Sequence, residues 1–301
     1  PYFGTPERPE CDMLYNVSTM CTTWHTVATR AVGLLRHQME QVFALPRSYL
    51  FQNYLRCHDD IGWGLDYSWL ARWQGEEEVP HKKYLNDWFT GRWPGSWSRG
   101  ELYNDDPRLG DARLCGTTAS LCGVESALDS GDPDALERAI RCDWMLHAWM
   151  FSQSGIPVLY SGDELGQLND YHYHGDPAKF DDSRYVHRGS FQWDQAALCR
   201  DESTVPGRMF QGLRRLEIIR GREQVFRADA EVTLLDAGNR CVLAIRRRYG
   251  GEELIALFNF SEHPQDAWCP AGSMTDLVSG QKLEGGSLNL PGYGFLWLKR
   301  S

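Results

Sequence analysis

The chain has 301 residues and a net charge of −10, with a sequence pI near 5.4. An acidic protein repels the phosphates of nucleic acids and of anionic membranes, so neither is an expected partner. No run of residues reaches the roughly 18 consecutive apolar positions that a membrane helix needs. Twelve Trp, 13 Tyr and 12 Phe suit a large core, and they equally suit stacking against neutral sugar rings.

The nine Cys are scattered and odd in number. None forms a C-x-x-C pair, and no Cys and His residues have the spacing of a zinc site. We therefore expect reduced thiols, a cytoplasmic protein, and no metal or other cofactor. The first residue is Pro1 and not Met, which suggests a chain that begins in mid-protein, with any targeting signal out of view.

Residues 1–22 are predicted to be loops, because Pro6 and Pro9 disfavour a helix before Glu10. Apolar residues then recur at helical spacing from about Thr23 to Phe43. The segment from Tyr49 to Cys57 has the pattern of a buried strand. It is followed at once by His58, Asp59 and Asp60.

Residues 61–125 are rich in Trp, Gly, Asp and Arg and show one helical patch, around Lys82–Phe89. A run this long between periodic elements predicts an inserted, loop-rich subdomain. Asp132 and Pro133 then open a strong helix, as an N-cap and the first helical residue, and this helix should end at Ser154-Gly155.

A short strand at 156–160 and a helix over 206–222 follow. Strands that alternate with helices and carry polar residues after them are typical of a (β/α)8 barrel. Only about three barrel strands can be counted, so we predict that residues 1–222 are the C-terminal part of a barrel, with the subdomain at about 61–125. Short strands in 223–301 predict a C-terminal β-sandwich.

Three groups of side chains could carry chemistry. Asp59, beside His58 and Asp60 after a strand, could bind sugar hydroxyls and stabilise positive charge at an anomeric carbon, or the group could cap a turn. Ser161-Gly-Asp-Glu164 could act at the same rim or brace loops. Arg113 and Arg184 could clamp a carboxylate or lie at the surface. Nucleophile-elbow, phosphate-loop, dinucleotide and H-E-x-x-H motifs do not occur.

Several segments together resemble the amylosucrase and sucrose hydrolase branch of the α-amylase superfamily (glycoside hydrolase family 13). The His-Asp pair and Gly-x-Pro-x-x-Tyr-x-Gly-x-Glu are marks of that superfamily, and His-Asp-Asp-Ile-Gly-Trp with Asp-Asp-Ser-Arg is similar to its sucrose-acting members. The matching segments occur in family order and are Tyr54–Trp63, Gly110–Ser120, Gly155–Glu164, Asn169-Asp170, Asp181–Arg188 and Phe258–Glu262.

The resemblance implies a retaining mechanism with a covalent glucosyl-enzyme, whose nucleophile and acid/base would lie upstream of this sequence. Asp59 would be the third carboxylate, which stabilises the transition state, and His58 would donate to a hydroxyl of the same glucose ring. By the same comparison Asp60 and Arg113 would face the fructosyl side. Arg184 would pair with an Asp of the upstream part and close the pocket.

Two further residues take roles from the resemblance. Glu10 would be a carboxylate at the rim of the site, and Lys82 would stand where polymer-forming relatives carry an Arg for glucan binding. Lys keeps the charge but loses the planar fork. The expected partners are sucrose, α-glucan and the N-terminal remainder of the same enzyme. Two alternatives stay open, namely a sucrose hydrolase that makes no polymer and a non-catalytic fragment or carbohydrate-binding piece.

Overall fold

The computed structural model describes residues 2–5 and 7–300. It divides the chain into two compact units. Unit 1 comprises the residues up to Tyr54, the segment Trp144–Val158, and everything from Leu213 onward; unit 2 comprises Leu55–Asp143 and Leu159–Gly212. The predicted domain boundary at 222–223 stays a prediction.

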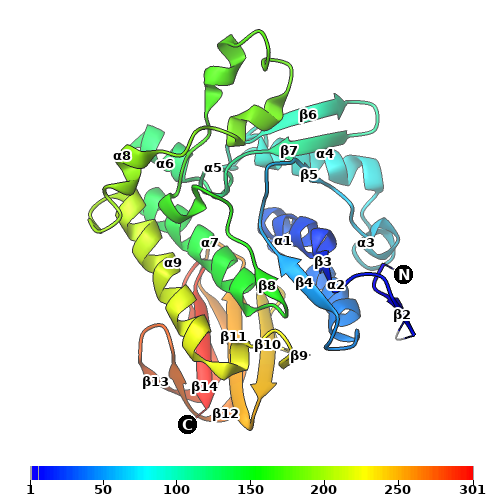
Figure 1. The fold of residues 1–301 in the computed structure, drawn as a ribbon, viewed down its shortest axis with the longest axis vertical. Helices are drawn as coiled ribbons and strands as arrows, with labels where there is room; N and C mark the ends of the chain where they lie inside the picture. Colours follow the sequence, from blue (N-terminus) through cyan, green and yellow to red (C-terminus); the bar gives the residue numbers. More distant parts are fainter. Residues whose placement is uncertain (1, 6, 301) are drawn as a thin grey trace. The chain divides into compact units, whose positions relative to one another are not determined.

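Unit 1 contains a parallel sheet of three strands, β3 (Met13–Tyr15), β4 (Leu50–Asn53) and β8 (Ile156–Pro157), in the order β3-β4-β8 (Figure 1). The described residues add no further strand to this sheet, so it is open and not a closed barrel. Tyr15 and Ile156, on its two outer strands, are 68% and 46% exposed. These parallel strands agree with the count of about three made from the sequence.

The strand β4 is shorter than predicted, because it ends at Asn53 and not at Cys57. The buried side chain of Asn53 donates to the carbonyl oxygen of Ser154 (2.7 Å) and accepts from the amide of Asn16 (2.8 Å). These bonds fix the end of the strand, and the chain then runs on as a loop toward Asp59.

Two helices replace the single helix predicted over 23–43, and the first starts inside the segment predicted as loop. They are α1 (Val17–Thr29) and α2 (Gly33–Phe43). Arg30 ends α1 in a left-handed conformation with φ 55°. Its guanidinium pairs with Glu262, which compensates for a backbone conformation that is rare outside Gly.

The C-terminal β module is one six-stranded antiparallel sheet in the order β13-β12-β14-β11-β10-β9. The predicted two-sheet sandwich is therefore not what the described residues form. The backbone N–H of Trp268 in β12 donates to the carbonyl oxygen of Ala237, just past β9 (2.8 Å), so the sheet curls around an apolar core that includes Val242, Leu257 and Leu298. The strands are β9 (Glu231–Leu235), β10 (Val242–Tyr249), β11 (Glu252–Asn259), β12 (Gln265–Asp276), β13 (Lys282–Leu290) and β14 (Phe295–Arg300).

A helix covers this sheet where a second sheet was expected. The helix α7 (Pro133–Ser152) belongs to unit 1 from Trp144 onward. The ring of Trp149 lies 5.6 Å from that of Phe258, and the indole N–H of Trp297 donates to the hydroxyl of Ser152 (2.9 Å). The face of the sheet opposite the core of Val242, Leu257 and Leu298 is thus buried against helix side chains.

Arg247 is the middle residue of three consecutive arginines, Arg246–Arg248, in β10. Its side chain is fully buried and donates to the carbonyl oxygens of Val225 (2.7 Å), Ser152 (2.6 Å) and Arg227 (2.8 Å). Burial lowers the pKa of Arg247 to about 9. Three carbonyl acceptors make this burial tolerable.

Unit 2 contains a three-stranded antiparallel sheet in the order β5-β7-β6. The predicted insert over 61–125 is therefore more regular than a loop-rich stretch. Asp66 caps α3 by accepting from the N–H of Trp69 (2.9 Å), and Gly75 ends that helix with φ 70°. The elements of this region are β5 (Ile61–Gly62), α3 (Tyr67–Gln74), α4 (Glu78–Phe89), β6 (Glu101–Asp106), β7 (Asp111–Cys115), α5 (Thr118–Leu121) and α6 (Val124–Ser130).

The remaining elements are short, apart from α9 (Val205–Arg222), which begins in unit 2 and ends in unit 1. In the described part of the chain, no helix has both the length and the apolar character that crossing a bilayer demands. The short elements are the hairpin strands β1 (Gly4–Thr5) and β2 (Arg8–Pro9), the helix α8 (Trp193–Ala196) and the 3₁₀ turns η1 (Asp163–Leu165), η2 (Tyr171–Gly175), η3 (Ser183–His187) and η4 (Gln224–Phe226).

Candidate active site

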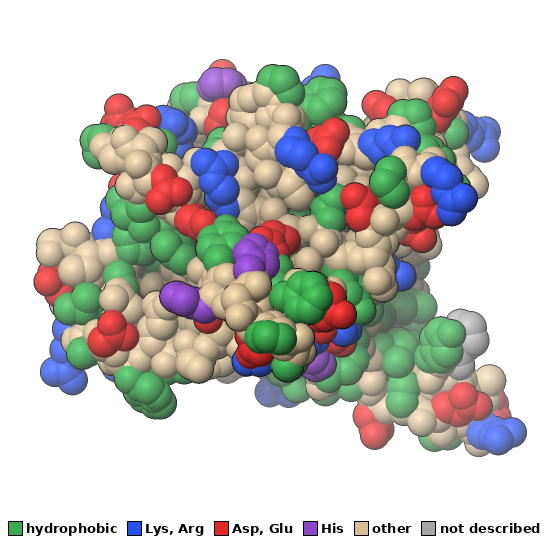
Figure 2. Space-filling view, turned by 90° about the horizontal axis from the view of Figure 1, so that it is seen from above, with side chains coloured by type: hydrophobic (Ala, Val, Ile, Leu, Met, Phe, Trp, Pro, Cys, Tyr) green, Lys and Arg blue, Asp and Glu red, His purple; other side chains and the backbone are tan. Residues whose placement is uncertain are grey.

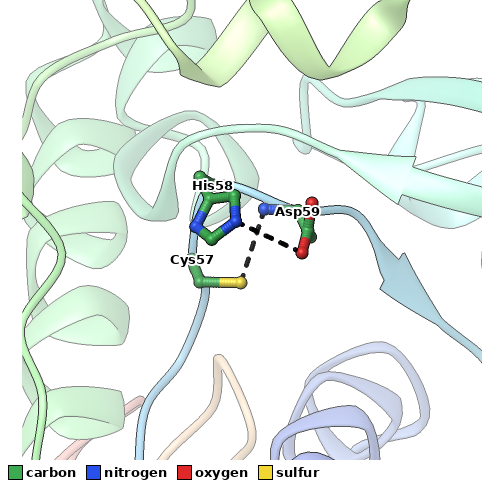
Figure 3. A group of neighbouring side chains, drawn as sticks. All are labelled: Cys57, His58 and Asp59. Carbon is green, nitrogen blue, oxygen red and sulfur yellow. Dashed lines mark hydrogen bonds and ion pairs between the residues drawn. The ribbon is translucent and has the colours of Figure 1, made fainter.

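The loop that follows β4 presents His58 and Asp59 to solvent. Their side chains are 69% and 55% exposed, and the Nε2 of His58 lies 3.4 Å from Oδ2 of Asp59. The backbone N–H of Asp59 donates to the Sγ of Cys57 at 3.4 Å. Figure 3 shows these three side chains turned toward one another. The loop thus offers a carboxylate and an imidazole that a ligand can reach.

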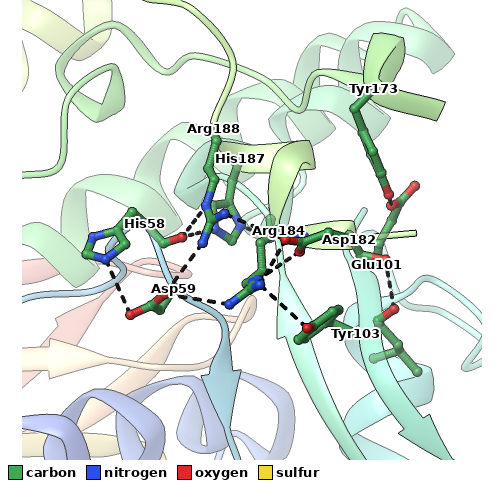
Figure 4. A network of polar contacts seen from close by, with 12 residues as sticks. His58, Asp59, Glu101, Tyr103, Tyr173, Asp182, Arg184, His187 and Arg188 are labelled. Carbon is green, nitrogen blue, oxygen red and sulfur yellow. Dashed lines mark hydrogen bonds and ion pairs between the residues drawn. The ribbon is translucent and has the colours of Figure 1, made fainter. Parts of the chain in front are cut away.

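Two arginines flank the other oxygen of Asp59. The Nη2 of Arg188 lies 3.5 Å and the Nη1 of Arg184 lies 4.0 Å from Oδ1. Arg188 also donates through Nε to the carbonyl oxygen of His58 (2.6 Å). Figure 4 shows this network around Asp59. The two arginines therefore approach Oδ1 of Asp59, whereas Oδ2 faces His58.

Arg184 has its own carboxylate partner within unit 2. It donates to Asp182 through Nε (2.8 Å) and Nη2 (2.8 Å), and its guanidinium lies 4.5 Å from the ring centroid of Tyr103. The hydrogen bonds from Arg184 lower the pKa of Asp182 and raise the pKa of Arg184. Asp182, two positions earlier, thus accepts both bonds from the guanidinium of Arg184. The upstream Asp that the resemblance implies as a partner of Arg184 stays a prediction.

His187 contacts the backbone of the loop that carries His58 and Asp59. Its Nδ1 accepts from the backbone N–H of Gly116 (3.0 Å), and its Nε2 lies 3.3 Å from the carbonyl oxygen of His58. Burial, followed by the charge of Arg56, lowers the pKa of His187 to about 4. His187 is therefore neutral at pH 7, with its proton on Nε2. Sequence reasoning missed His187 and Arg188, although both lie in the Asp181–Arg188 segment that carried part of the resemblance.

Asp163, of the Ser161–Glu164 segment, braces loops and does not face a ligand. It is buried, accepts from Arg56 Nε (2.8 Å) and accepts from the hydroxyl of Thr118 (3.1 Å). Arg56 in turn lies 4.4 Å from the ring centroid of Tyr160. Glu164 accepts from the backbone N–H of Gly162 (2.8 Å), which closes its own turn. The bracing alternative therefore describes this segment.

Asp60 and Arg113 lie on the other side of the loop. The Nη1 of Arg113 is 4.0 Å from Oδ1 of Asp60, and the Arg113 side chain is half-exposed. Arg113 lies opposite Gly62 in the β5–β7 pair. A Cβ at Gly62 would be only 2.4 Å from the Nη1 of Arg113, so Gly62 provides the space for this guanidinium. Their assignment to the fructosyl side stays a prediction.

Lys82 and Glu10 occupy different surroundings. The Nζ of Lys82 lies 2.8 Å from Glu78 and 5.1 Å from the ring centroid of Tyr67. Glu10 belongs to unit 1, is exposed, and donates its backbone N–H to the carbonyl oxygen of Phe3 (3.1 Å). The roles that the resemblance gave to both residues stay predictions.

Acidic and basic side chains lie close together around the site. The face shown in Figure 2 carries acidic and basic side chains interspersed among apolar ones, with no broad patch of one sign. Close to Asp59, the pairs of Arg184 with Asp182 and of Arg56 with Asp163 neutralise two of the arginines.

Comparison with known proteins places this geometry in context. No protein-family model matches the sequence. Glucosylglycerate phosphorylase of Escherichia coli (strain K12) is 27% identical over 176 residues, which are 58% of this chain and 30% of that protein. The chain thus spans less than a third of this relative.

Three solved structures share the fold over more than 90% of the chain. AmyP in complex with maltose matches with a TM-score of 0.60 at 14% identity, over 99% of this chain and 51% of that one. Sucrose 6F-phosphate phosphorylase from Thermoanaerobacter thermosaccharolyticum matches with a TM-score of 0.59 at 17% identity, over 91% of this chain and 47% of that one. The α-amylase from H. orenii matches with a TM-score of 0.55 at 13% identity, over 96% of this chain and 49% of that one. The chain therefore corresponds to about half of each of these structures.

Proposed function

We propose that this chain, a relative of the α-amylase superfamily, is the C-terminal portion of a retaining enzyme that cleaves sucrose and transfers glucose to an α-glucan or to water. The observation that carries the proposal is the placement of Asp59. It is a solvent-accessible carboxylate beside His58, and the guanidinium groups of Arg188 and Arg184 lie 3.5 Å and 4.0 Å from its other oxygen.

Asp59 suits a role in stabilising charge that develops during bond cleavage. In retaining glycosidases the anomeric carbon becomes positive in an oxocarbenium-like transition state. A fixed carboxylate next to that carbon acts without reorganising, because Arg188 and the bonded His58 backbone already position it. His58 Nε2 can donate to a hydroxyl of the same ring. The nucleophile and the acid/base would be supplied by the upstream portion.

The acceptor is the half of this function that concerns Lys82. Lys82, the candidate glucan-binding cation, is paired with Glu78, so binding a glucan there would compete with an existing ion pair. The complete enzyme should be incubated with sucrose, and the glucose, fructose and insoluble glucan should be quantified. Fructose release with glucan supports the transferase, fructose with equal free glucose supports the hydrolase, and no fructose release rejects sucrose as the donor.

Phosphorolysis is a second candidate, and two observations favour it. The chain is 27% identical to a glucosylglycerate phosphorylase over 176 residues, and the guanidinium groups of Arg184 and Arg188 lie within 4.0 Å of Asp59. Guanidinium groups bind phosphate well. The test is to supply sucrose or glucosylglycerate with and without inorganic phosphate and to measure glucose 1-phosphate. Phosphate-dependent formation of this product would replace the transferase proposal.

The alternative of a non-catalytic fragment has a direct test. The 301-residue chain alone should show no sucrose turnover, since two of the three carboxylates that the chemistry needs are expected upstream. Addition of a separately expressed N-terminal portion should restore fructose release. Turnover by the chain alone would refute the upstream placement, and a failure of the mixture to act would favour the non-catalytic reading.

A further inference from the structure

The sequence offered no cysteines and histidines at zinc spacing, yet three consecutive residues converge in space. In the part of the chain that the structure describes, Cys57, His58 and Asp59 are the group whose potential ligand atoms all lie within 4.8 Å of one another. Spacing rules for zinc sites address ligands separated along the chain. These spacing rules do not detect a ligand set made of consecutive residues on one loop.

We propose that Cys57, His58 and Asp59 form a site for a thiophilic divalent cation, Zn²⁺, which competes with sugar for the same side chains. The competition rests on the proposed function, whereas the binding itself does not. A thiolate, an imidazole and a carboxylate are the ligand types that zinc uses in proteins, and three protein ligands leave a fourth position for water.

The distances suit a tetrahedral ion. Zinc bonds of about 2.0–2.1 Å to N and O place those two ligand atoms about 3.4 Å apart in a tetrahedron. The Nε2 of His58 lies 3.4 Å from Oδ2 of Asp59. The sulfur of Cys57 lies within 4.8 Å of one ring nitrogen of His58 and one carboxylate oxygen of Asp59, where a tetrahedron needs about 3.5 Å. Rotation of one exposed or half-buried side chain covers that difference.

Neighbouring charges oppose the cation only in part. Arg188 and Arg184 approach Oδ1 of Asp59, while the proposed ligand is Oδ2. Arg184 is already paired with Asp182, and Arg56 with Asp163. Asp60 adds a further negative charge near Cys57. On binding, the Cys57 thiol releases its proton to solvent and a sulfur–zinc bond forms, with no change of oxidation state.

The consequence concerns access to the site. An ion held by Oδ2 of Asp59 and Nε2 of His58 occupies the atoms that would otherwise meet sugar hydroxyls. Free Zn²⁺ would therefore inhibit the complete enzyme competitively with its donor sugar. A chelator would reverse that inhibition, because no covalent change has occurred.

Co²⁺ binding to the untagged 301-residue chain tests the site without any need for activity. We expect a near-ultraviolet thiolate-to-cobalt charge-transfer band that titrates to one ion per chain and is displaced by Zn²⁺. Cys57→Ser should abolish the band and weaken Zn²⁺ binding by more than about tenfold. Cys199→Ser, a change at another partly exposed thiol, should leave both unchanged. No band, or a band that persists in Cys57→Ser, would overturn the site.

The complete enzyme tests the competition separately. Zn²⁺ should raise the apparent KM for the donor without lowering kcat, and Cys57→Ser should relieve the inhibition about tenfold, with each protein compared with its own zinc-free rate. If cobalt binds through Cys57 but inhibition is not competitive, the competition is wrong and the metal site stands. If cobalt binds but no donor is turned over without metal, the proposed function fails instead.

Discussion

The imidazole Nε2 of His187 lies 3.3 Å from the backbone carbonyl oxygen of His58. The other ring nitrogen of His187 accepts from Gly116. Protonation of His187 would break the Gly116 bond, since Nδ1 would become a donor facing a donor. The position of the loop that carries Asp59 is thus coupled to a neutral, buried imidazole.

The first prediction is a loss of stability in mild acid. The folded pKa of His187 is about 4, below the ordinary value of 6.5, so the unfolded chain binds more protons between these values. The stabilisation is complete above pH 6.5 and is lost as the pH falls toward 4. When the pH is lowered from 7 to 5, protonation of His187 in the unfolded chain should reduce the unfolding free energy by about 2 kcal/mol.

Urea denaturation of wild-type chain and of His187→Gln at the two pH values measures this loss. Gln can still accept and donate, but it does not titrate in this range. The variant should therefore lose about 2 kcal/mol less than the wild type on going from pH 7 to pH 5. Equal losses in the two proteins would remove His187 as the cause.

The second prediction concerns Asp59 in the complete enzyme. Asp59→Asn keeps the shape of the side chain but removes the negative charge, so kcat should fall by about three orders of magnitude. Asp129→Asn, at an exposed position of α6, should leave kcat within about twofold. Initial rates of fructose release give both values. A loss of less than tenfold at Asp59 would exclude it from the site.

The third prediction tests the two-point hydrogen bonding of the Arg184 guanidinium separately from its positive charge. Arg184→Lys loses the two-point bond to Asp182. The donor's kcat/KM should fall about tenfold or more, mainly through KM, because positioning and not charge has changed.

The chain offers a matched control for this change. Arg108 makes the same two-point bond to Asp106, also two residues earlier (3.1 and 2.8 Å), and its side chain is 87% exposed. Arg108→Lys should leave the steady-state kinetics unchanged. If both variants lost kcat/KM equally, the effect of Arg184 would have no connection with Asp59.

The fourth prediction concerns the stability of unit 1. Arg247→Met should lower the unfolding free energy by about 3 kcal/mol, because three carbonyl oxygens, two of them in buried hydrogen bonds, lose their donor. Arg248→Met removes only a partly exposed pair with Glu253 and should cost less than about 1 kcal/mol. Guanidinium denaturation of both variants provides the comparison. Similar small losses would mean that water or relaxed backbone satisfies the carbonyls.

Local signals in the sequence predicted several elements well. Asp132 caps α7, accepting from the N–H groups of Asp134 (2.9 Å) and Ala135 (3.1 Å), and α7 starts at the predicted Pro133. The helix predicted over 206–222 is confirmed as α9. Caps and Pro act on immediate neighbours. Their effect can therefore be read without knowledge of the fold.

Other features depend on contacts that no local pattern reveals. The residue that ends α1 is Arg30 and not Gly or Pro, and its partner Glu262 lies 232 positions away. His187 bonds to a residue 129 positions earlier. The motif comparison found the segment that contains His187 and Arg188, but only the folded chain shows which of its side chains meet Asp59.

The outer strands β3 and β8 each have one hydrogen-bonding partner strand among the described residues, and each exposes a large apolar side chain, Tyr15 or Ile156. Backbone groups left unpaired beside apolar side chains act as templates for other copies of the same molecule. Purified alone, the polypeptide should therefore self-associate as its concentration rises, and light scattering would reveal soluble clusters before any precipitate forms.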